Sequence, residues 1–194
     1  MRQARIERIT AETAITLSLD LDGGEVRIAT GLAFFDHMLH QLAKHGGFGL
    51  EVEARGDLVV DSHHLIEDAG LCLGDALREA LGDRRGIARF GEAHAPLDET
   101  LARVIVDLSG RPYTVFDAEL PSLVIGDGFQ TEMVREFFIA FATRGQFNLH
   151  AAVLYGLNTH HKIEALFKAL ALALKRAARA EGTGLPSTKG TLTA

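Results

Sequence analysis

Two histidine doublets are the residues in this sequence whose type and spacing can do chemistry. His63 and His64 open the segment HHLIE, His160 and His161 open the segment HHKIE, and a glutamate closes each one. On an α-helix successive side chains point about 100° apart, so both histidines and the glutamate of a segment lie on one face. Imidazole and carboxylate ligands without a thiolate favour manganese, iron, cobalt, nickel or zinc. Each doublet therefore predicts a metal platform.

The repetition of the doublet predicts two metal ions. A single HHxxE segment is more often a set of ordinary polar residues on a helix, but the same segment occurs twice in this chain. Neighbouring rings diverge by about 100°, which makes it awkward for both histidines of a doublet to hold one ion, so each doublet is suited to serve two. Glu67 and Glu164 stand outside the histidine pairs, unlike the base inside the HExxH motif of zinc proteases, and are predicted to be ligands.

Length and composition indicate a folded protein with a substantial core. The chain has 194 residues, of which 47% are hydrophobic and 24% are charged, which is ordinary for a globular domain or for two small repeats that share one core. The net charge of −6 and the pI near 5.8 argue against a nucleic-acid binder, which needs a basic face. Because the protein as a whole is acidic, any anionic ligand must be bound by a few positively charged residues at one site.

Cysteine content and hydropathy favour a cytoplasmic protein without a membrane span. Cys72 is the single cysteine, which excludes a disulfide framework and a cysteine zinc site. The first ten residues lack the apolar segment of a signal peptide. The most apolar late stretch, at 165–178, is interrupted by Lys168 and is shorter than the roughly 20 residues that a span needs.

Hydrophobic periodicity divides the first half into strands and helices. Apolar residues alternate with polar ones from Ile15 to Asp22, and Asp22-Gly23-Gly24 predicts a hairpin turn into the next strand. The other elements expected here are a helix from about Phe34 to Lys44 that stops at Gly46-Gly47, a strand over Leu50 to Ala54, and a doublet helix capped by Asp61 or Ser62 that ends at Gly82.

The second half repeats this order. A strand over 101–110, a hairpin into 112–120, a helix over about 132–143, a strand over 147–154 and the second doublet helix are expected. Glu12-Thr13 corresponds to Glu99-Thr100, and HGGF at 45–48 corresponds to RGQF at 144–147. The chain is therefore predicted to be internally duplicated. His37 and Glu136 occupy equivalent helix positions in the two halves and are predicted to be further metal ligands.

The repeated element order predicts an α+β fold. We expect two pseudo-repeated halves, each with a mostly antiparallel four-stranded sheet and two helices on one face. The predicted organisation is one domain over residues 1–194, with repeats at about 1–86 and 87–180 and a substrate-binding tail over 181–194.

Six motifs resemble the imidazoleglycerol-phosphate dehydratase family and run in the family's order along nearly the whole chain. They are FFDHMLHQLAKHG at 34–46, DSHHLIEDAG at 61–70, PLDE at 96–99, DLSGRPY at 107–113, GLNTHHKIEALFKALALAL at 156–174 and PSTKG at 186–190. The resemblance implies a ribosomal S5 domain 2-like fold without the phosphatase domain of bifunctional relatives. It also implies a cytoplasmic enzyme of histidine biosynthesis that dehydrates imidazole glycerol phosphate to imidazole acetol phosphate.

The resemblance further implies two Mn²⁺ ions per active site and a homo-oligomer of 24 subunits with active sites between subunits. One ion would be bound by His37, His64, His160 and Glu164, and the other by His63, Glu67, Glu136 and His161. Many family members carry histidine where this chain has Glu136. With a metal on each ring nitrogen, the substrate would bind as an imidazolate that acts as the electron sink.

Glu12 is by the same resemblance the catalytic acid and base. Substrate contacts would come from Glu12, His37, His45, His63, Glu67, Arg89, Arg111, His160, Lys168, Ser187 and Lys189. A metal-dependent hydrolase and a metal-stabilised structural shell are the alternatives. A structural shell has no need of an anion site, and the arginines, Ser187 and Lys189 are suited to binding a phosphate. His40, His94 and His150 have no assigned role.

Overall fold

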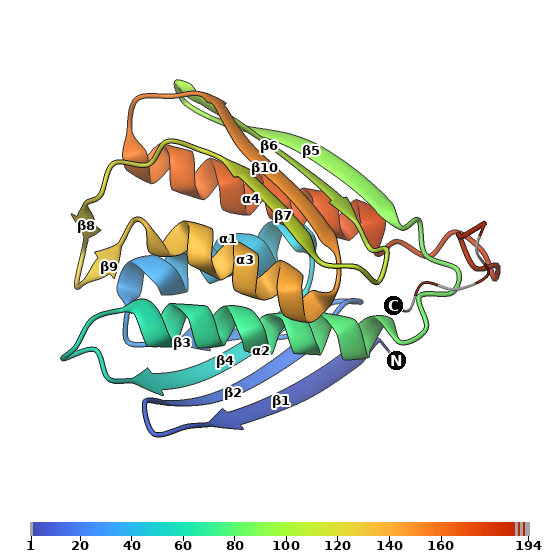
Figure 1. The fold of residues 1–194 in the computed structure, drawn as a ribbon, viewed down its shortest axis with the longest axis horizontal. Helices are drawn as coiled ribbons and strands as arrows, with labels where there is room; N and C mark the ends of the chain where they lie inside the picture. The colour runs from blue at the N-terminus through green and yellow to red at the C-terminus, as the bar shows by residue number, and fades with distance from the viewer. Residues whose placement is uncertain (1, 189, 191, 193–194) are drawn as a thin grey trace.

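The computed structural model describes residues 2–188, 190 and 192. Its two halves have the same order of main elements (Figure 1). The first half contains β1 (Gln3–Ile9), β2 (Thr13–Asp20), β3 (Val26–Ala29), α1 (Ala33–Gly46), β4 (Gly49–Gly56) and α2 (His63–Leu81). The second contains β5 (Phe90–Leu97), β6 (Thr100–Asp107), β7 (Tyr113–Asp117), α3 (Met133–Gly145), β10 (Asn148–Tyr155) and α4 (Thr159–Ala177), with the short strands β8 (Val124–Ile125) and β9 (Phe129–Gln130) inserted before α3. The predicted α+β fold of two similar halves is confirmed.

Each half forms a four-stranded sheet, in the order β1-β2-β4-β3 and β5-β6-β10-β7. In the first sheet β1, β2 and β4 are antiparallel neighbours, and β3 is parallel to β4. The second sheet repeats this pattern. The prediction of mostly antiparallel sheets is therefore confirmed.

The two predicted hairpins, after Asp22 and after Gly110, are wrong. The strands β3 and β7 do not pair with the strands that precede them but lie parallel to β4 and β10. The reason is that a helix follows each of them, and a strand–helix–strand unit makes its two strands parallel neighbours. As a result, β4 separates β2 from β3, and β10 separates β6 from β7.

The four helices form a layer between the two sheets (Figure 1). Helix α2 packs on β1 and β2, and α4 packs on β5 and β6. The helices of the two halves also pack on each other, α2 against α3 and α1 against α4. The core is therefore continuous across both repeats, with buried phenylalanines of α3 and α4 stacked at its centre, such as Phe137 and Phe167, whose ring centroids lie 5.4 Å apart.

Strands β1 and β5 are not predicted by the sequence pattern. The inward face of β5 consists of Gly91, Ala93 and Ala95, which are small and make a weak hydrophobic signal. They are small because α4 lies very close to this strand. A Cβ atom on Gly91 would come within 2.0 Å of the carbonyl oxygen of Ala173.

Glycines also allow close contact between α2 and α3. A Cβ on Gly70 would lie 2.9 Å from the carbonyl oxygen of Phe137, and one on Gly74 would lie 2.6 Å from that of Phe141. Both distances are shorter than real Cβ contacts, and the atoms that they meet are backbone atoms, so the two helices must separate to admit a methyl group.

Replacing Gly74 by alanine should therefore lower the free energy of unfolding by about 1–3 kcal/mol, the usual cost of overpacking. The sign is informative, because Gly→Ala inside a helix ordinarily stabilises by roughly 0.5–1 kcal/mol. Denaturant unfolding of the variant measures the effect. Gly182→Ala is the control, since a Cβ there meets no described atom within 4 Å, and equal stability of both variants would contradict the prediction.

The apolar stretch at 165–178 belongs to α4 and its C-terminal end, and its alanines and leucines are mostly buried in the core. No helix among the described residues is long and apolar enough to cross a membrane. Cys72 is buried on α2, and burial raises the pKa of its thiol to about 11. The thiol is thus a packing group, as its place in a helical pattern predicts.

Candidate metal and substrate site

Both histidine doublets lie in the first turns of their helices, at the same end of the helical layer, on the left in Figure 1. The amide N–H of His161 donates to the Asn158 side chain at 3.3 Å, which caps α4. Of the two predicted caps of α2, Asp61 accepts the N–H of His63 at 2.8 Å, while Ser62 occupies the cap position without accepting a helix N–H. These hydrogen bonds fix the start of each helix, and therefore the backbone that carries each doublet.

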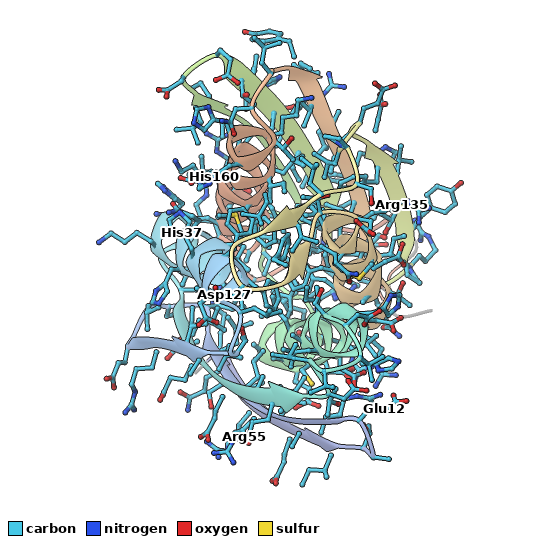
Figure 2. All side chains as sticks on the ribbon, turned by 90° about the vertical axis from the view of Figure 1, so that its left-hand side faces the viewer. Glu12, His37, Arg55, Asp127, Arg135 and His160 are labelled. Carbon is cyan, nitrogen blue, oxygen red and sulfur yellow. The ribbon has the colours of Figure 1, made fainter. Side chains whose placement is uncertain are left out.

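Three predicted ligands meet between α1 and α4. The Nε2 atoms of His37 and His160 each lie 3.1 Å from Oε2 of Glu164, and one ligand atom of each residue lies within 4.8 Å of the other two. Figure 2 looks at this end of the molecule and shows His37 and His160 together on one side. We call these three residues the α1/α4 cluster.

The carboxylate of Glu164 is the charged centre of this cluster. Only 7% of the residue is exposed, and burial opposes its ionisation. Hydrogen bonds from Lys168, His37 and His160 outweigh burial and lower the pKa of Glu164 to about 2. The ammonium of Lys168 lies 2.6 Å from Oε1, which leaves Oε2 to the histidines. Two imidazoles and one carboxylate in this arrangement fit a divalent metal ion.

The corresponding residues of the other helix pair are His63 and Glu67 on α2 and Glu136 on α3. Helix α2 packs against α3 as α4 packs against α1. Oε2 of Glu67 lies 3.7 Å from Nε2 of His63, and the carboxylate of Glu136 pairs with Arg135 at 3.0 Å. The duplication thus repeats the set of side chains, although the side chain of Glu67 is 45% exposed and that of Glu164 only 10%.

The second histidine of each doublet faces a carboxylate of its own half. Nδ1 of His64 lies 3.0 Å from Oδ2 of Asp57, and Nδ1 of His161 lies 2.7 Å from Oε2 of Glu99. The hydrogen bond with Asp57 raises the pKa of His64. The structure therefore brings together three of the four predicted ligands of one ion, while His64, the fourth, lies with Asp57.

Sequence reasoning missed the roles of Asp57 and Glu99. The pKa of Glu99 is lowered by the backbone N–H of Asn158, by the side chain of His161 and by the backbone N–H of Leu157. The repeated Glu-Thr pair at 12–13 and 99–100 is a signal that could have found Glu99. Asp57 has no such signal, since it lies in the loop after β4 and reaches His64 through the tertiary fold.

Glu12 lies at the turn between β1 and β2, across the molecule from His37 and His160 in Figure 2. Its backbone N–H donates to Oγ1 of Thr10 at 3.1 Å. Thr10 in turn contacts the hydroxyl of Thr13 at 3.1 Å, and that hydroxyl donates to the buried carboxylate of Asp68. The backbone of Glu12 is thus anchored, whereas its side chain is 55% exposed and lies 3.8 Å from Nδ1 of His64.

The predicted anion-binding residue Arg89 lies at the far end of α4 from the doublet. Its backbone N–H donates to the carbonyl of Ala177, the last residue of α4. Its guanidinium binds Asp107 with two hydrogen bonds, of 2.7 and 3.1 Å, and donates to the carbonyl of Pro186 at 2.8 Å. At a rise of 1.5 Å per residue, Ala177 is about 25 Å from His160 along the helix axis.

The other predicted substrate residues are divided between the two ends. Nε2 of His45 contacts Gln41 at 3.0 Å, and burial and the nearby Lys168 lower the pKa of this imidazole. Arg111 follows β6, with an exposed side chain and a carbonyl that accepts from Asn148 at 2.7 Å. Ser187 lies in the tail next to Pro186, and Lys189 is outside the described residues.

Comparison with known proteins is consistent with this arrangement. The profile of the imidazoleglycerol-phosphate dehydratase family matches residues 30–174. Imidazoleglycerol-phosphate dehydratases of Lacticaseibacillus casei and Methanococcoides burtonii are 60% and 55% identical to this chain, over 99% of its length and 100% of theirs.

Solved structures of the same family share the fold. The enzyme of Staphylococcus aureus has a TM-score of 0.83 and 39% identity, and the match covers 92% of this chain and 99% of that one. The enzyme of Pyrococcus furiosus, in complex with (S)-C348, has a TM-score of 0.83 and 37% identity over 96% and 99%. The profile match includes both histidine doublets, and the chain belongs to the imidazoleglycerol-phosphate dehydratase family.

Proposed function

We propose that this chain is a hydro-lyase of histidine biosynthesis that converts imidazole glycerol phosphate into imidazole acetol phosphate and water, at a site shared between subunits. Membership of the family supports the reaction and the pathway. The observation that carries the site is the α1/α4 cluster of His37, His160 and Glu164, whose ligand atoms lie within 4.8 Å of one another. The family assignment favours dehydration over metal-dependent hydrolysis and over a purely structural shell.

Two Mn²⁺ ions are the proposed cofactors. In this proposal the α1/α4 cluster takes His64 of a neighbouring subunit as its fourth ligand. The residues His63, Glu67 and Glu136 likewise take His161 of a neighbour. Ions bound there would draw electron density from both ring nitrogens of the substrate and stabilise the ring after it loses a proton.

The need for more than one subunit follows from distances within the chain. Arg89 and the tail lie about 25 Å from His160 along α4, whereas the three-carbon chain between the imidazole and the phosphate spans only a fraction of that length. A substrate held by the α1/α4 cluster must therefore meet the phosphate-binding residues of another copy.

Exposed apolar residues beside the doublets support a homo-oligomer. Val59, in the loop before α2, is 102% exposed, and Leu157, in the equivalent loop before α4, is 86% exposed. A neighbouring subunit at this end would bury both residues. An assembly of 24 subunits, as the family resemblance implies, is our proposal.

Glu12 is the proposed acid and base. Its carboxylate takes the proton from the middle carbon of the chain, and the protonated carboxyl donates to the hydroxyl on the carbon attached to the ring, which leaves as water. The enol that remains becomes the ketone of the product. The anchored backbone and exposed side chain of Glu12 suit a group that must reach a substrate and exchange a proton twice.

The phosphate is proposed to bind Arg89, Arg111, Ser187 and Lys189, with further substrate contacts from His45 and Lys168. Arg89 already pairs with Asp107, so it carries little unbalanced charge. Its hydrogen bond to Pro186 places the tail, and with it Ser187, beside the guanidinium. In this proposal the main task of Arg89 is to orient the tail, and Arg111 and Lys189 supply most of the positive charge for the phosphate.

The activity is tested with purified protein, manganese and imidazole glycerol phosphate, by following the formation of imidazole acetol phosphate. We expect turnover with Mn²⁺, loss of turnover after chelation and recovery when the metal is returned. Failure to form the ketone with saturating Mn²⁺ would refute the proposed reaction, and full activity of the chelated protein would refute the metal requirement.

Removing residues 185–194 should raise the substrate KM by about 10- to 100-fold, because one or two charge-assisted hydrogen bonds to the phosphate are lost at about 1.5–3 kcal/mol each. Manganese content should stay constant, since the predicted metal ligands lie outside the tail. Steady-state kinetics and metal analysis measure the two quantities. A truncated protein with the normal KM would show that the tail is not part of the anion site.

A further inference from the structure

We propose that Glu99 is a positioning residue for His161, which its carboxylate holds with the proton on Nδ1 so that Nε2 keeps the lone pair for a metal ion. This inference rests on the proposed function, in which His161 of each chain is a ligand for an ion of a neighbouring subunit. Neither the repeated HHxxE segment nor the reaction requires a residue in this role. The inference is based on the contacts of the Glu99 side chain.

Both oxygens of Glu99 are occupied in different ways. Oε1 accepts the backbone N–H groups of Leu157 and Asn158 at 3.0 and 2.8 Å and the hydroxyl of Thr100 at 3.0 Å. Oε2 lies 2.7 Å from Nδ1 of His161. One oxygen therefore ties Glu99 to the loop that starts α4, and the other binds the ring.

This geometry decides the tautomer of His161. An ionised carboxylate can only accept hydrogen bonds, so the proton of a neutral ring must be on Nδ1, and the lone pair is on Nε2. Ligand histidines commonly donate their second nitrogen to a carboxylate in this way, which fixes the ring and makes it a better donor to the metal. The ring of His161 is thus oriented before any ion binds.

The first half of the chain gives the same task to a different residue. Asp57 holds Nδ1 of His64 at 3.0 Å. Glu12, which is the counterpart of Glu99 in the duplication, lies 3.8 Å from that nitrogen, and its side chain is 55% exposed. The two equivalent glutamates therefore have different roles. Glu99 holds the ring of a metal ligand, whereas the exposed side chain of Glu12 is free to reach a substrate.

The substitution Glu99→Gln tests the proposal. The amide oxygen can keep the hydrogen bonds to Leu157 and Asn158, while the amide N–H₂ replaces the oxygen that faces His161. Because this N–H₂ can only donate, Nδ1 becomes the acceptor and the proton moves to Nε2, which then cannot bind a metal ion.

We expect Glu99→Gln to weaken the binding of one of the two Mn²⁺ ions by about 10- to 100-fold, the usual effect of losing such a partner. Titration followed by the electron paramagnetic resonance of free Mn²⁺ gives the affinity, and metal analysis gives the stoichiometry. Unfolding of the metal-free variant should match that of the metal-free parent protein.

Two further variants separate the explanations. Asp98→Asn removes a neighbouring carboxylate, 77% exposed and 3.9 Å from Nε2 of His161, and should leave both affinities unchanged. His161→Ala should lose the same ion that Glu99→Gln weakens. If His161→Ala binds both ions normally, the ligand set of the proposed function is wrong.

If His161→Ala loses one ion but Glu99→Gln binds both normally, Glu99 only anchors the loop before α4, and the inference fails while the proposed function stands. If Asp98→Asn and Glu99→Gln weakened Mn²⁺ binding equally, the cause would be the loss of negative charge near His161 and not the loss of the hydrogen bond to Nδ1. That result would also overturn the inference. If Glu99→Gln unfolds, Asp57→Asn is the alternative test, because Asp57 holds His64 in the same way but lies in the loop before α2 and not in the loop before α4. Normal binding of both ions by that variant would contradict the mechanism.

Discussion

Glu12→Gln should lower kcat by about 10²- to 10⁴-fold, the usual contribution of a positioned acid or base. Glutamine keeps the shape and the hydrogen bonding of the side chain but cannot accept the substrate proton. The backbone anchor through Thr10 is independent of the carboxylate, so the turn should keep its conformation. Metal content and oligomer size should be unchanged, and KM should change far less than kcat.

Glu7→Gln is the matched control for this experiment. Glu7 is an exposed glutamate of β1, five residues before Glu12, and it loses the same charge in the same sheet. Its kcat should equal that of the parent enzyme. If Glu12→Gln retained near-normal turnover, the acid and base role would pass to another carboxylate, with Asp98 and Glu164 as the next candidates.

Removal of the metal should weaken both the fold and the assembly. An ion that binds only the assembled protein stabilises it by about 2.7 kcal/mol when its concentration is 100 times its Kd. Chelation with EDTA should therefore lower the melting temperature and shift the proposed oligomer toward smaller species. Size-exclusion chromatography and thermal unfolding, with and without added Mn²⁺, measure the two effects.

His64→Ala should reproduce part of this result. If His64 completes the α1/α4 cluster of a neighbour, the variant should lose about one of the two ions per subunit, and with it some of the oligomer and most of the activity. His94→Ala, which removes an exposed imidazole on β5, should behave like the parent protein. Unchanged size and melting after chelation would show that metal binding and assembly are not coupled.

The helices and the position of the chemistry could be predicted from the sequence. The helix predicted over 34–44 is α1 (Ala33–Gly46), and the doublet helix predicted to stop at Gly82 is α2 (His63–Leu81). These elements are encoded locally, by apolar residues at helical spacing and by glycines at the ends. The duplication is equally local, because it requires only that one segment be compared with another.

Strand neighbours were decided only by the tertiary structure. Alternation shows that residues 13–20 form a strand, but it does not show which strand pairs with each edge. Here β1 and β4 pair with β2, and the predicted partner β3 lies beyond β4. Pairing depends on the connections and on the helix packed across them, so a turn signal such as Asp22-Gly23-Gly24 can be followed by a crossover.

The same division holds for the site. The sequence by itself determined which residue types are available, since His37, His160 and Glu164 are all predicted as ligands of one ion. Only the tertiary structure decided that these three meet within one chain, that His64 lies instead with Asp57, and that Arg89 lies at the opposite end of α4. The physical reason is that coordination and hydrogen bonding act over a few ångströms, and Glu164 reaches His37 across 127 residues of sequence only because α1 packs against α4.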